Sequence, residues 1–170
     1  CNGYRNPELL ADMARTVDHI SAGRLILGIG AGWFERDYDA YGYAFGTPGS
    51  RLAELEAALP RIERRWAALN PAPTRRIPVL IGGGGEKKTL RYTARHADIW
   101  HGFGDAATIA RKGAILDEWC ATEGRTPADI ERSTAVETGP DGVAQGLMDA
   151  GVTLVTIGLT GPTYDLAKAN

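Results

Sequence analysis

Short apolar runs alternate with helix-like stretches along the chain, and two of the runs end in clusters of glycine. This alternation indicates βαβ units and a parallel sheet, because parallel strands need a long crossover connection. The predicted strands lie at 25–32, 77–82, 98–104, 129–137 and 152–159, and the predicted helices at 5–21, 49–69, 86–97, 105–124 and 140–151. The sequence therefore predicts an α/β fold. Because no low-complexity linker divides it, we expect a single domain over residues 1–170.

Residue types at the ends of the predicted helices give their approximate borders. Asn6 is the expected N-cap of the first helix and Pro7 its first residue, while Gly23 is the expected C-terminal cap. In this first helix the apolar residues Leu10, Met13, Val17 and Ile20 follow one another at helical spacing.

Two later helices have similar borders. The second predicted helix has Ser50 as its expected N-cap and a kink or break near Pro60. A helix is also expected to start at Asp105 and to end at Gly124.

Composition excludes several classes of function. The chain has 170 residues, a formal net charge of -2 and 44% hydrophobic residues, which is the balance of a globular protein. Lys and Arg (19) nearly match Asp and Glu (21), so no nucleic-acid surface is expected. No apolar run approaches the roughly 18 residues of a membrane span. Two cysteines, Cys1 and Cys120, give neither a disulfide framework nor metal-ligand spacing, and a cytoplasmic location is the default expectation.

The two glycine clusters, "GIGAGW" at 28–33 and "IGGGGEKK" at 81–88, follow predicted strands. In parallel sheets the carboxyl ends of the strands form the ligand-binding face, and glycine lets the backbone approach a ring or a phosphate closely. The second cluster leads into a helix expected at Glu86, whose N-terminus favours an anion. Together they suit a planar, phosphate-bearing cofactor. The alternative is that the glycines only form tight turns and allow close helix–sheet packing.

Longer motifs carry a family resemblance. "YRNPELLADMARTVDHISAGRLILGIGAGWFERDYDAYGYAF", "IPVLIGGGGEKKTLRYTARHADIWH" and "GRTPADIERS" resemble, in this order, segments of the bacterial luciferase-like flavin and deazaflavin oxidoreductases. The nearest branch uses coenzyme F-420 and includes methylene-tetrahydromethanopterin reductases. The resemblance covers most of the chain and becomes weaker after Ser133.

This resemblance implies a (β/α)8 TIM barrel, of which the chain would hold strands four to eight. The chain could be a part of a larger enzyme or a truncated product. We favour the first explanation, because the unpaired sheet edge of a truncated barrel invites aggregation. The implied activity is hydride transfer between F-420 and a small organic substrate. The alternatives are an FMN-dependent luciferase-like monooxygenase and a non-catalytic flavin-binding paralogue. Relatives are often dimers, so a homodimer is expected, with neither a nucleic-acid nor a membrane partner.

The same resemblance implies which residues bind the cofactor. It implies that the residues near the ring of the cofactor are Asn2, Gly30, Ala31, Gly32 and Trp33. It also implies that the phosphate-bearing side of the cofactor is bound by Gly82, Gly83, Gly84 and Gly85. Sugar-phosphate dehydrogenases of the family carry a glutamate at the position of Trp33, so that substrate class is disfavoured. No catalytic residue is implied, because relatives supply it from the early strands, and no metal is expected.

The remaining notable side chains have ordinary explanations. His101 at a strand end either faces a ligand or is structural, and Tyr38 and Tyr41 either line the site or pack in a loop. Lys87 and Lys88 are weak candidates for phosphate binding. Structural, packed or solvated roles are expected for His19, His96, Cys120, Trp66 and Trp119.

Overall fold

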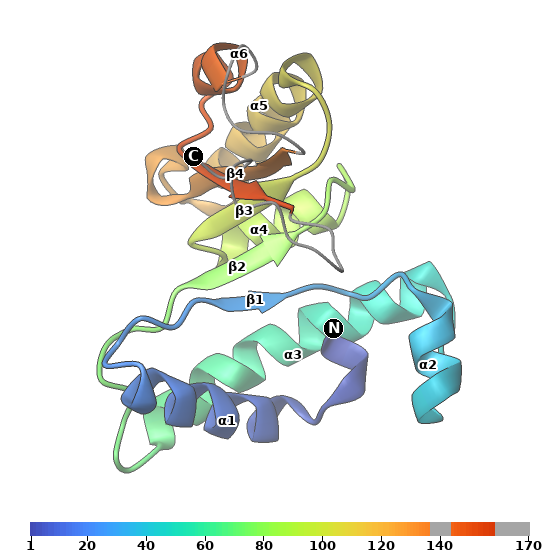
Figure 1. The fold of residues 1–170 in the computed structure, drawn as a ribbon, viewed down its shortest axis with the longest axis vertical. Coiled ribbons are helices and arrows are strands. Elements are labelled where there is room, and N and C mark those ends of the chain that lie inside the picture. Colours follow the sequence, from blue (N-terminus) through green and yellow to red (C-terminus); the bar gives the residue numbers. More distant parts are fainter. Residues whose placement is uncertain (137–143, 159–170) are drawn as a thin grey trace. The chain divides into compact units, whose positions relative to one another are not determined.

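The computed structural model describes residues 1–136 and 144–158 (Figure 1). The chain divides into two compact units, residues 1–80 and 81–170, and each is described by itself. The helices of the first unit are η1 (Asn2–Tyr4), α1 (Pro7–Ile20), α2 (Glu35–Tyr41) and α3 (Pro48–Ala68), and its strand is β1 (Leu27–Ile29). Strand β2 (Val79–Gly82) spans the boundary. The second unit contains α4 (Thr89–His96), β3 (Ile99–Gly102), α5 (Ala106–Glu123), η2 (Pro127–Asp129), β4 (Glu131–Val136), α6 (Ala144–Asp149) and β5 (Leu154–Ile157).

The start of α1 is as predicted, and the helical spacing of its apolar residues is confirmed. The side chain of Asn6 accepts hydrogen bonds from the amides of Glu8 (2.9 Å) and Leu9 (3.1 Å), and Pro7 is the first residue. At the other end, Gly23 has a φ of 78°. The exposed fractions of Met13, Val17 and Ile20 are 43%, 46% and 80%, and the buried residues are instead Ala11, Ala14 and Asp18.

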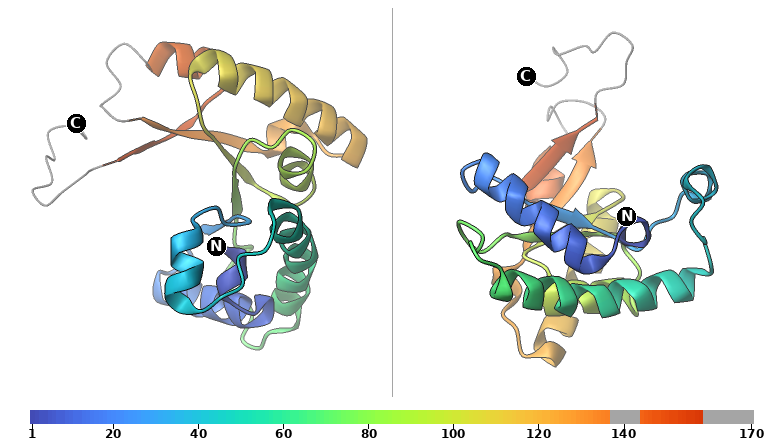
Figure 2. Two further views of the ribbon diagram at one scale, coloured as in Figure 1. Left: turned by 90° about the vertical axis from the view of Figure 1, so that its right-hand side faces the viewer. Right: turned by 90° about the horizontal axis from the view of Figure 1, so that it is seen from below.

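Small buried residues let α1 lie close to α3, and the two helices run side by side (Figure 2). Two bidentate ion pairs join them. Arg61 binds Glu8 at 2.6 and 2.8 Å, and Arg65 binds Asp12 at 2.7 and 2.8 Å. The indole of Trp66 donates to the carbonyl oxygen of a residue in α1 at 3.0 Å. The expectation that Trp66 is a packing residue is therefore met.

Three expectations about this region were wrong: a break near Pro60, an N-cap at Ser50 and a loop before this helix. Helix α3 is continuous through Pro60, because buried residues on both sides of it, Leu55 and Ile62, hold its two halves against the same core. Its N-cap is Thr47, and Ser50 is the reciprocal partner in a capping box. The segment before it, expected as a loop, contains α2.

Strand β1 is shorter than the predicted strand at 25–32, because residues 25–26 and 30–32 lie outside the ladder. In the first unit the amide of Leu27 donates to the carbonyl of Pro78 at 2.9 Å, and in the second the amide of Gly83 donates to the carbonyl of His101 at 3.1 Å. Strands β3 and β4 are parallel, as are β4 and β5. Within the second unit, β3, β4 and β5 follow one another across the sheet in chain order. The predicted α/β class is confirmed.

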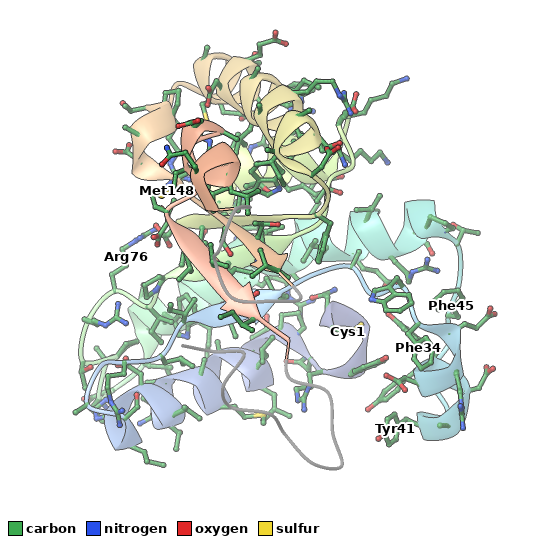
Figure 3. The ribbon with its side chains drawn as sticks, turned by 45° about the horizontal axis from the view of Figure 1, so that its top comes forward. Cys1, Phe34, Tyr41, Phe45, Arg76 and Met148 are labelled. Atoms are coloured by element: carbon green, nitrogen blue, oxygen red, sulfur yellow. The ribbon has the colours of Figure 1, made fainter. Side chains whose placement is uncertain are left out.

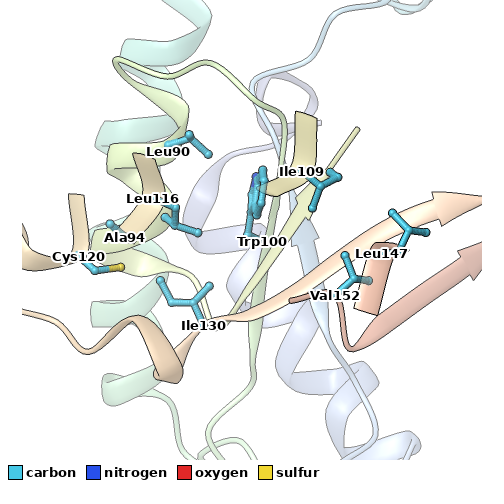
Figure 4. Close-up of a cluster of buried hydrophobic side chains, with 9 residues drawn as sticks. All are labelled: Leu90, Ala94, Trp100, Ile109, Leu116, Cys120, Ile130, Leu147 and Val152. Atoms are coloured by element: carbon cyan, nitrogen blue, oxygen red, sulfur yellow. The ribbon is translucent and has the colours of Figure 1, made fainter. Parts of the chain in front are cut away.

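The core of the second unit lies between the strands and the helices α4, α5 and α6 (Figure 4). Its largest member is Trp100, which is fully buried. The other members are Leu90, Ala94, Ile109, Leu116, Cys120, Ile130, Leu147 and Val152. The thiol of Cys120 is packed as expected, and burial raises its pKa.

Helix α5 has the predicted borders, and α4 does not. Asp105 caps α5 by accepting a hydrogen bond from the amide of Thr108 at 2.9 Å, and Gly124 ends the helix in a left-handed conformation. Helix α4 begins at Thr89 rather than at Glu86, because residues 86–88 form a turn. Residues 140–143 of the helix predicted at 140–151 lie outside the described residues. No helix in the described part of the chain has both the length and the apolar character to cross a membrane.

Candidate functional site

Asn2 is held at the end of β1 and has an unpaired side-chain oxygen. Its amide donates to the carbonyl of Gly30 at 2.9 Å, and only 6% of the residue is exposed. The atom Oδ1 is buried and has no hydrogen-bond partner among the described residues. Because an unsatisfied buried acceptor costs roughly 1–3 kcal/mol, this oxygen is suited to accept a hydrogen bond from a ligand.

The backbone at Gly32 admits no side chain. Gly32 has a φ of 87°, and a Cβ there would overlap the hydroxyl of Tyr38 and the sulfur of Cys1. These two atoms lie 2.9 Å apart, and the same hydroxyl donates to the carbonyl of Ala31 at 3.3 Å. Burial raises the pKa of Tyr38. Tyr38 is therefore a packed residue that supports the glycine segment.

Arg51 holds this segment from α3. It is 7% exposed, and its Nε donates to the carbonyl of Gly32 at 3.1 Å. A second nitrogen donates to the carbonyls of Phe45 (3.1 Å) and Gly46 (3.4 Å), and the guanidinium lies 3.7 Å from the centre of the Phe45 ring. The sequence did not single out Arg51, because nothing in its helix marks it as buried.

Aromatic side chains surround α2, as Figure 3 shows for Phe34, Tyr41 and Phe45. Trp33 is 82% exposed and Tyr41 is 71% exposed. The rings of Trp33 and Phe34 are 5.3 Å apart and tilted. Trp33 therefore lies open to solvent or to a ligand at the end of β1.

In the second unit, two indoles hold the four-glycine turn after β2. Trp100 donates from Nε1 to the carbonyl of Gly83 at 2.8 Å, and Trp119 donates to the carbonyl of Glu86 at 2.8 Å. Gly83 has a φ of 125°, a backbone conformation in which any residue with a side chain would be strained. A Cβ on Gly82 would have no heavy atom within 4 Å, so open space lies beside that backbone. The conformation of the turn is therefore fixed, with one bare side.

The remaining glycines of the turn lie against two other side chains. A Cβ on Gly84 would overlap Nζ of Lys112 and would lie 3.1 Å from its Cε. A Cβ on Gly85 would be 2.8 Å from Oγ1 of Thr89. The structure thus brings Lys112 and Thr89 to the turn, and sequence reasoning had proposed neither of them.

His101 and Ser133 lie side by side on neighbouring strands of this unit. They are register partners on β3 and β4, and Nδ1 of His101 lies 2.6 Å from Oγ of Ser133. Ser133 is 1% exposed, and burial lowers the pKa of His101. The ring of Phe103 meets the imidazole edge-on at 5.0 Å. The histidine was considered in the sequence, whereas Ser133 was missed because "ERSTAV" gives no local signal for its partner.

The other side chains considered from the sequence have structural contacts. His19 lies 2.8 Å from the carbonyl of Ala72 through Nε2, and His96 ends α4. A cleft of about 370 Å³ in the first unit is not at the glycine segments. It is lined by Glu63, Trp66, Pro73, Arg75, Arg76, Ile77 and Val79.

The luciferase-like monooxygenase family matches residues 1–139, and the chain belongs to this family. An uncharacterized protein of Mycobacterium tuberculosis is 28% identical over 181 residues, which cover 96% of this chain and 63% of that protein. The chain therefore spans less than two thirds of the length of this curated relative.

Two solved structures show the likeness of fold. An F420-dependent secondary alcohol dehydrogenase in complex with an F420-acetone adduct has a TM-score of 0.82 at 13% identity, over 96% of this chain and 72% of that chain. The oxygenating constituent of 3,6-diketocamphane monooxygenase from Pseudomonas putida, in complex with FMN, has a TM-score of 0.58 at 16% identity, over 80% and 48%. The predicted fold is confirmed: the five strands are part of a luciferase-like (β/α)8 barrel.

Proposed function

We propose that the protein is an oxidoreductase that transfers a hydride between coenzyme F-420 and a small organic substrate. The observation that carries this proposal is the turn after β2, where a fixed glycine backbone faces open space at Gly82. Membership of the luciferase-like family supports a cofactor of the flavin or deazaflavin type. The likeness in fold to the F420-dependent secondary alcohol dehydrogenase supports the deazaflavin.

In each unit, considered by itself, there are residues that fit a part of such a cofactor. In the first unit, the buried and unpaired Oδ1 of Asn2 would accept a hydrogen bond from a ring N–H. Close to it along the strand end, Gly30, Ala31, Gly32 and Trp33 would lie beside the ring. In the second unit, Gly82, Gly83, Gly84 and Gly85 would bind the phosphate-bearing side. When bound, the deazaflavin supplies the ring carbon that carries the hydride.

His101 is the residue that we propose moves the accompanying proton. Its Nδ1 is engaged by Ser133, which leaves Nε2 to exchange a proton with the substrate. The burial that lowers its pKa keeps the imidazole neutral near pH 7, so it can accept a proton when the substrate gives up a hydride. In the reverse direction the ring must first be protonated, and the imidazolium then gives its proton from Nε2 to the substrate.

An FMN-dependent monooxygenase is the second candidate function. It is favoured by the family description and by the fold likeness to the 3,6-diketocamphane monooxygenase in complex with FMN. The same glycine turn would hold the phosphate of FMN. The two functions therefore differ in the ring that is bound and not in the fold.

The test is a calorimetric titration of the purified whole protein with F-420 and with FMN, alongside the quenching of tryptophan fluorescence. The exposed ring of Trp33 should report binding of either cofactor. Gly82→Ala places a methyl group in the open space and should weaken binding by about tenfold, in the range of one lost favourable contact. Gly28→Ala, which also meets no heavy atom within 4 Å, is the matched control and should bind as the wild type does.

Three outcomes separate the candidates. Tight binding of F-420 and weak binding of FMN would support the proposed function, and the reverse would support the monooxygenase. Binding of neither would overturn both and leave the non-catalytic paralogue. We also expect a cytoplasmic homodimer acting on a small molecule, which sedimentation of the whole protein and cell fractionation would test.

A further inference from the structure

The segment that contains α2 exposes several aromatic rings on one short stretch of chain. Trp33 is 82% exposed and Tyr41 is 71% exposed, while Phe34 and Tyr43 are each 43% exposed. We call these four residues the aromatic wall. Apolar side chains that are exposed singly are ordinary, whereas a set of them on one stretch of surface marks a place where something binds.

The aromatic wall is continuous with the two chain segments at the end of β1. Trp33 directly follows Gly32. On the other side, the ring of Tyr4 in η1 stacks on Tyr43 at 5.5 Å and lies 6.3 Å from the ring of Tyr41. The same short helix η1 carries Asn2, whose side-chain oxygen is buried and unpaired. A ligand that reaches this oxygen therefore has the aromatic wall as its neighbouring surface.

The segment that carries the wall is held in a fixed shape. Before α2, the carbonyl of Gly32 accepts from Nε of Arg51 at 3.1 Å, and after α2 the carbonyl of Phe45 accepts from another nitrogen of the same side chain at 3.1 Å. Between these points Tyr38 is 1% exposed, and its carbonyl accepts from the amide of Tyr43 at 2.8 Å. A preorganised surface loses little conformational entropy when a ligand covers it.

The charges of α2 restrict what can lie on the wall. The helix carries three carboxylates, those of Glu35, Asp37 and Asp39, and its basic residue is Arg36. Among the residues that the structure describes, none of these carboxylates forms an ion pair, and Asp37 accepts a hydrogen bond from the hydroxyl of Tyr4 at 3.5 Å. Their negative field repels an anionic ligand, whereas an apolar ligand gains by removing the rings from water.

We propose that the substrate of this oxidoreductase has an apolar body without negative charge, an alkyl chain or an aromatic ring, which lies on the aromatic wall. The carbon that exchanges the hydride then lies at the cofactor ring, on the side of Gly32. This inference rests on the proposed function for the reaction and adds the class of substrate. Of the two tyrosines considered from the sequence, Tyr41 belongs to the substrate surface and Tyr38 supports it from below.

The experiment measures the dissociation constants of uncharged 2-alkanones, from butanone to 2-nonanone, by calorimetry on the whole protein loaded with oxidised F-420. A ketone has no hydride to accept from the oxidised cofactor, so binding is measured without turnover. Each added methylene should lower Kd by about twofold, less than the roughly fourfold of complete burial. The anion 8-oxononanoate, which ends the same chain in a carboxylate, should bind about tenfold more weakly than 2-nonanone.

Two variants locate the surface. Tyr41→Ser removes a ring of the aromatic wall and should reduce the gain per methylene. Ile20→Ser, which removes an 80% exposed apolar side chain from α1, is the matched control and should keep the gain of the wild type. The affinity for the cofactor is measured alongside in each variant, so that a loss of cofactor is separated from a loss of substrate contact.

A Kd that does not depend on chain length, or the same gain per methylene in Tyr41→Ser and the wild type, would overturn the inference and leave the proposed function intact. A change from dimer to monomer in Tyr41→Ser, seen by sedimentation, would also overturn it, because a second copy would then cover the rings. If the wild type binds neither cofactor, the proposed function fails and the wall is tested in the free protein. There 2-nonanone, and not butanone, should shift the NMR signals of the Trp33 and Tyr41 rings, and absence of these shifts would overturn the inference as well.

Discussion

The indole of Trp100 donates a hydrogen bond from Nε1 to the carbonyl oxygen of Gly83 at 2.8 Å. This contact joins the buried core of the second unit to the first left-handed glycine of the turn after β2. The core and the proposed cofactor site are therefore not independent, because the ring of Trp100 fills the core and also orients the glycine turn. Substitutions in the core are expected to change binding at the turn.

Trp100→Phe tests this relationship. The substitution leaves most of the ring volume but removes the donor, so the carbonyl of Gly83 loses its partner. We expect the free energy of unfolding to fall by about 2 kcal/mol, measured by urea denaturation. Trp119→Phe, which removes the donor of an exposed hydrogen bond to the carbonyl of Glu86, is the matched control and should cost less. Equal losses in the two variants would show that the buried contact has no special weight.

Arg51→Lys should destabilise the first unit although it keeps the charge. A single ammonium cannot reach the carbonyls of Gly32, Phe45 and Gly46 together, nor stack on the ring of Phe45. We expect a loss of about 1–3 kcal/mol in the free energy of unfolding. Arg64→Lys on the exposed face of the same helix should change it by less than about 0.5 kcal/mol. An unchanged midpoint for Arg51→Lys would contradict the assigned role.

His101 should give the stability a dependence on pH. Burial lowers its pKa in the folded protein, so between that pKa and the ordinary value of 6.5 the unfolded chain binds more protons. The contribution of the neutral imidazole is complete above pH 6.5 and is lost as the pH falls through the folded pKa. In His101→Gln, urea midpoints measured across this range should lose that part of the slope. A slope identical to that of the wild type would contradict the lowered pKa.

Ser133 should decide which nitrogen of His101 carries the proton. In the mechanism proposed above, Nδ1–H donates to Ser133, and Nε2 is the free acceptor. Ser133→Ala should move the proton towards Nε2, which is visible in the nitrogen chemical shifts of the imidazole. Ser133→Thr keeps a hydroxyl and should preserve the wild-type pattern. If the wild type already carries its proton on Nε2, the assignment of His101 as the acceptor of the proton is wrong.

Glu123 gives a second effect of pH, at acid values. Hydrogen bonds from Arg95 and then Arg91 lower its pKa from 4.5 to about 2. The stability that it contributes is complete above pH 4.5 and is lost as the pH falls through about 2, because the unfolded chain binds the proton first. Glu123→Gln should therefore flatten the pH dependence of the urea midpoint in this range. Glu118→Gln, on the exposed face of the same helix, should leave it unchanged.

Much of the fold followed from local features of the sequence. Asn6, Asp105 and Gly124 have their predicted capping roles, because a cap depends on residues within one turn of the helix. The expected break at Pro60 was wrong, since packing on both sides of the proline outweighs its local cost. The buried face of α1 does not follow from the spacing of its apolar residues, because the neighbour α3 decides which face is buried.

The sequence by itself determined the order of strands and helices, the glycine segments at the strand ends and the resemblance to the luciferase-like family. These are properties of residues close together in the chain, so periodicity, caps and motifs reveal them. Only the tertiary structure decided that Ser133 meets His101, that Lys112 lies against Gly84 and that Arg51 holds Gly32. Each of these contacts joins different strands, turns or helices. Their partners are brought together by packing and register, which no local pattern encodes.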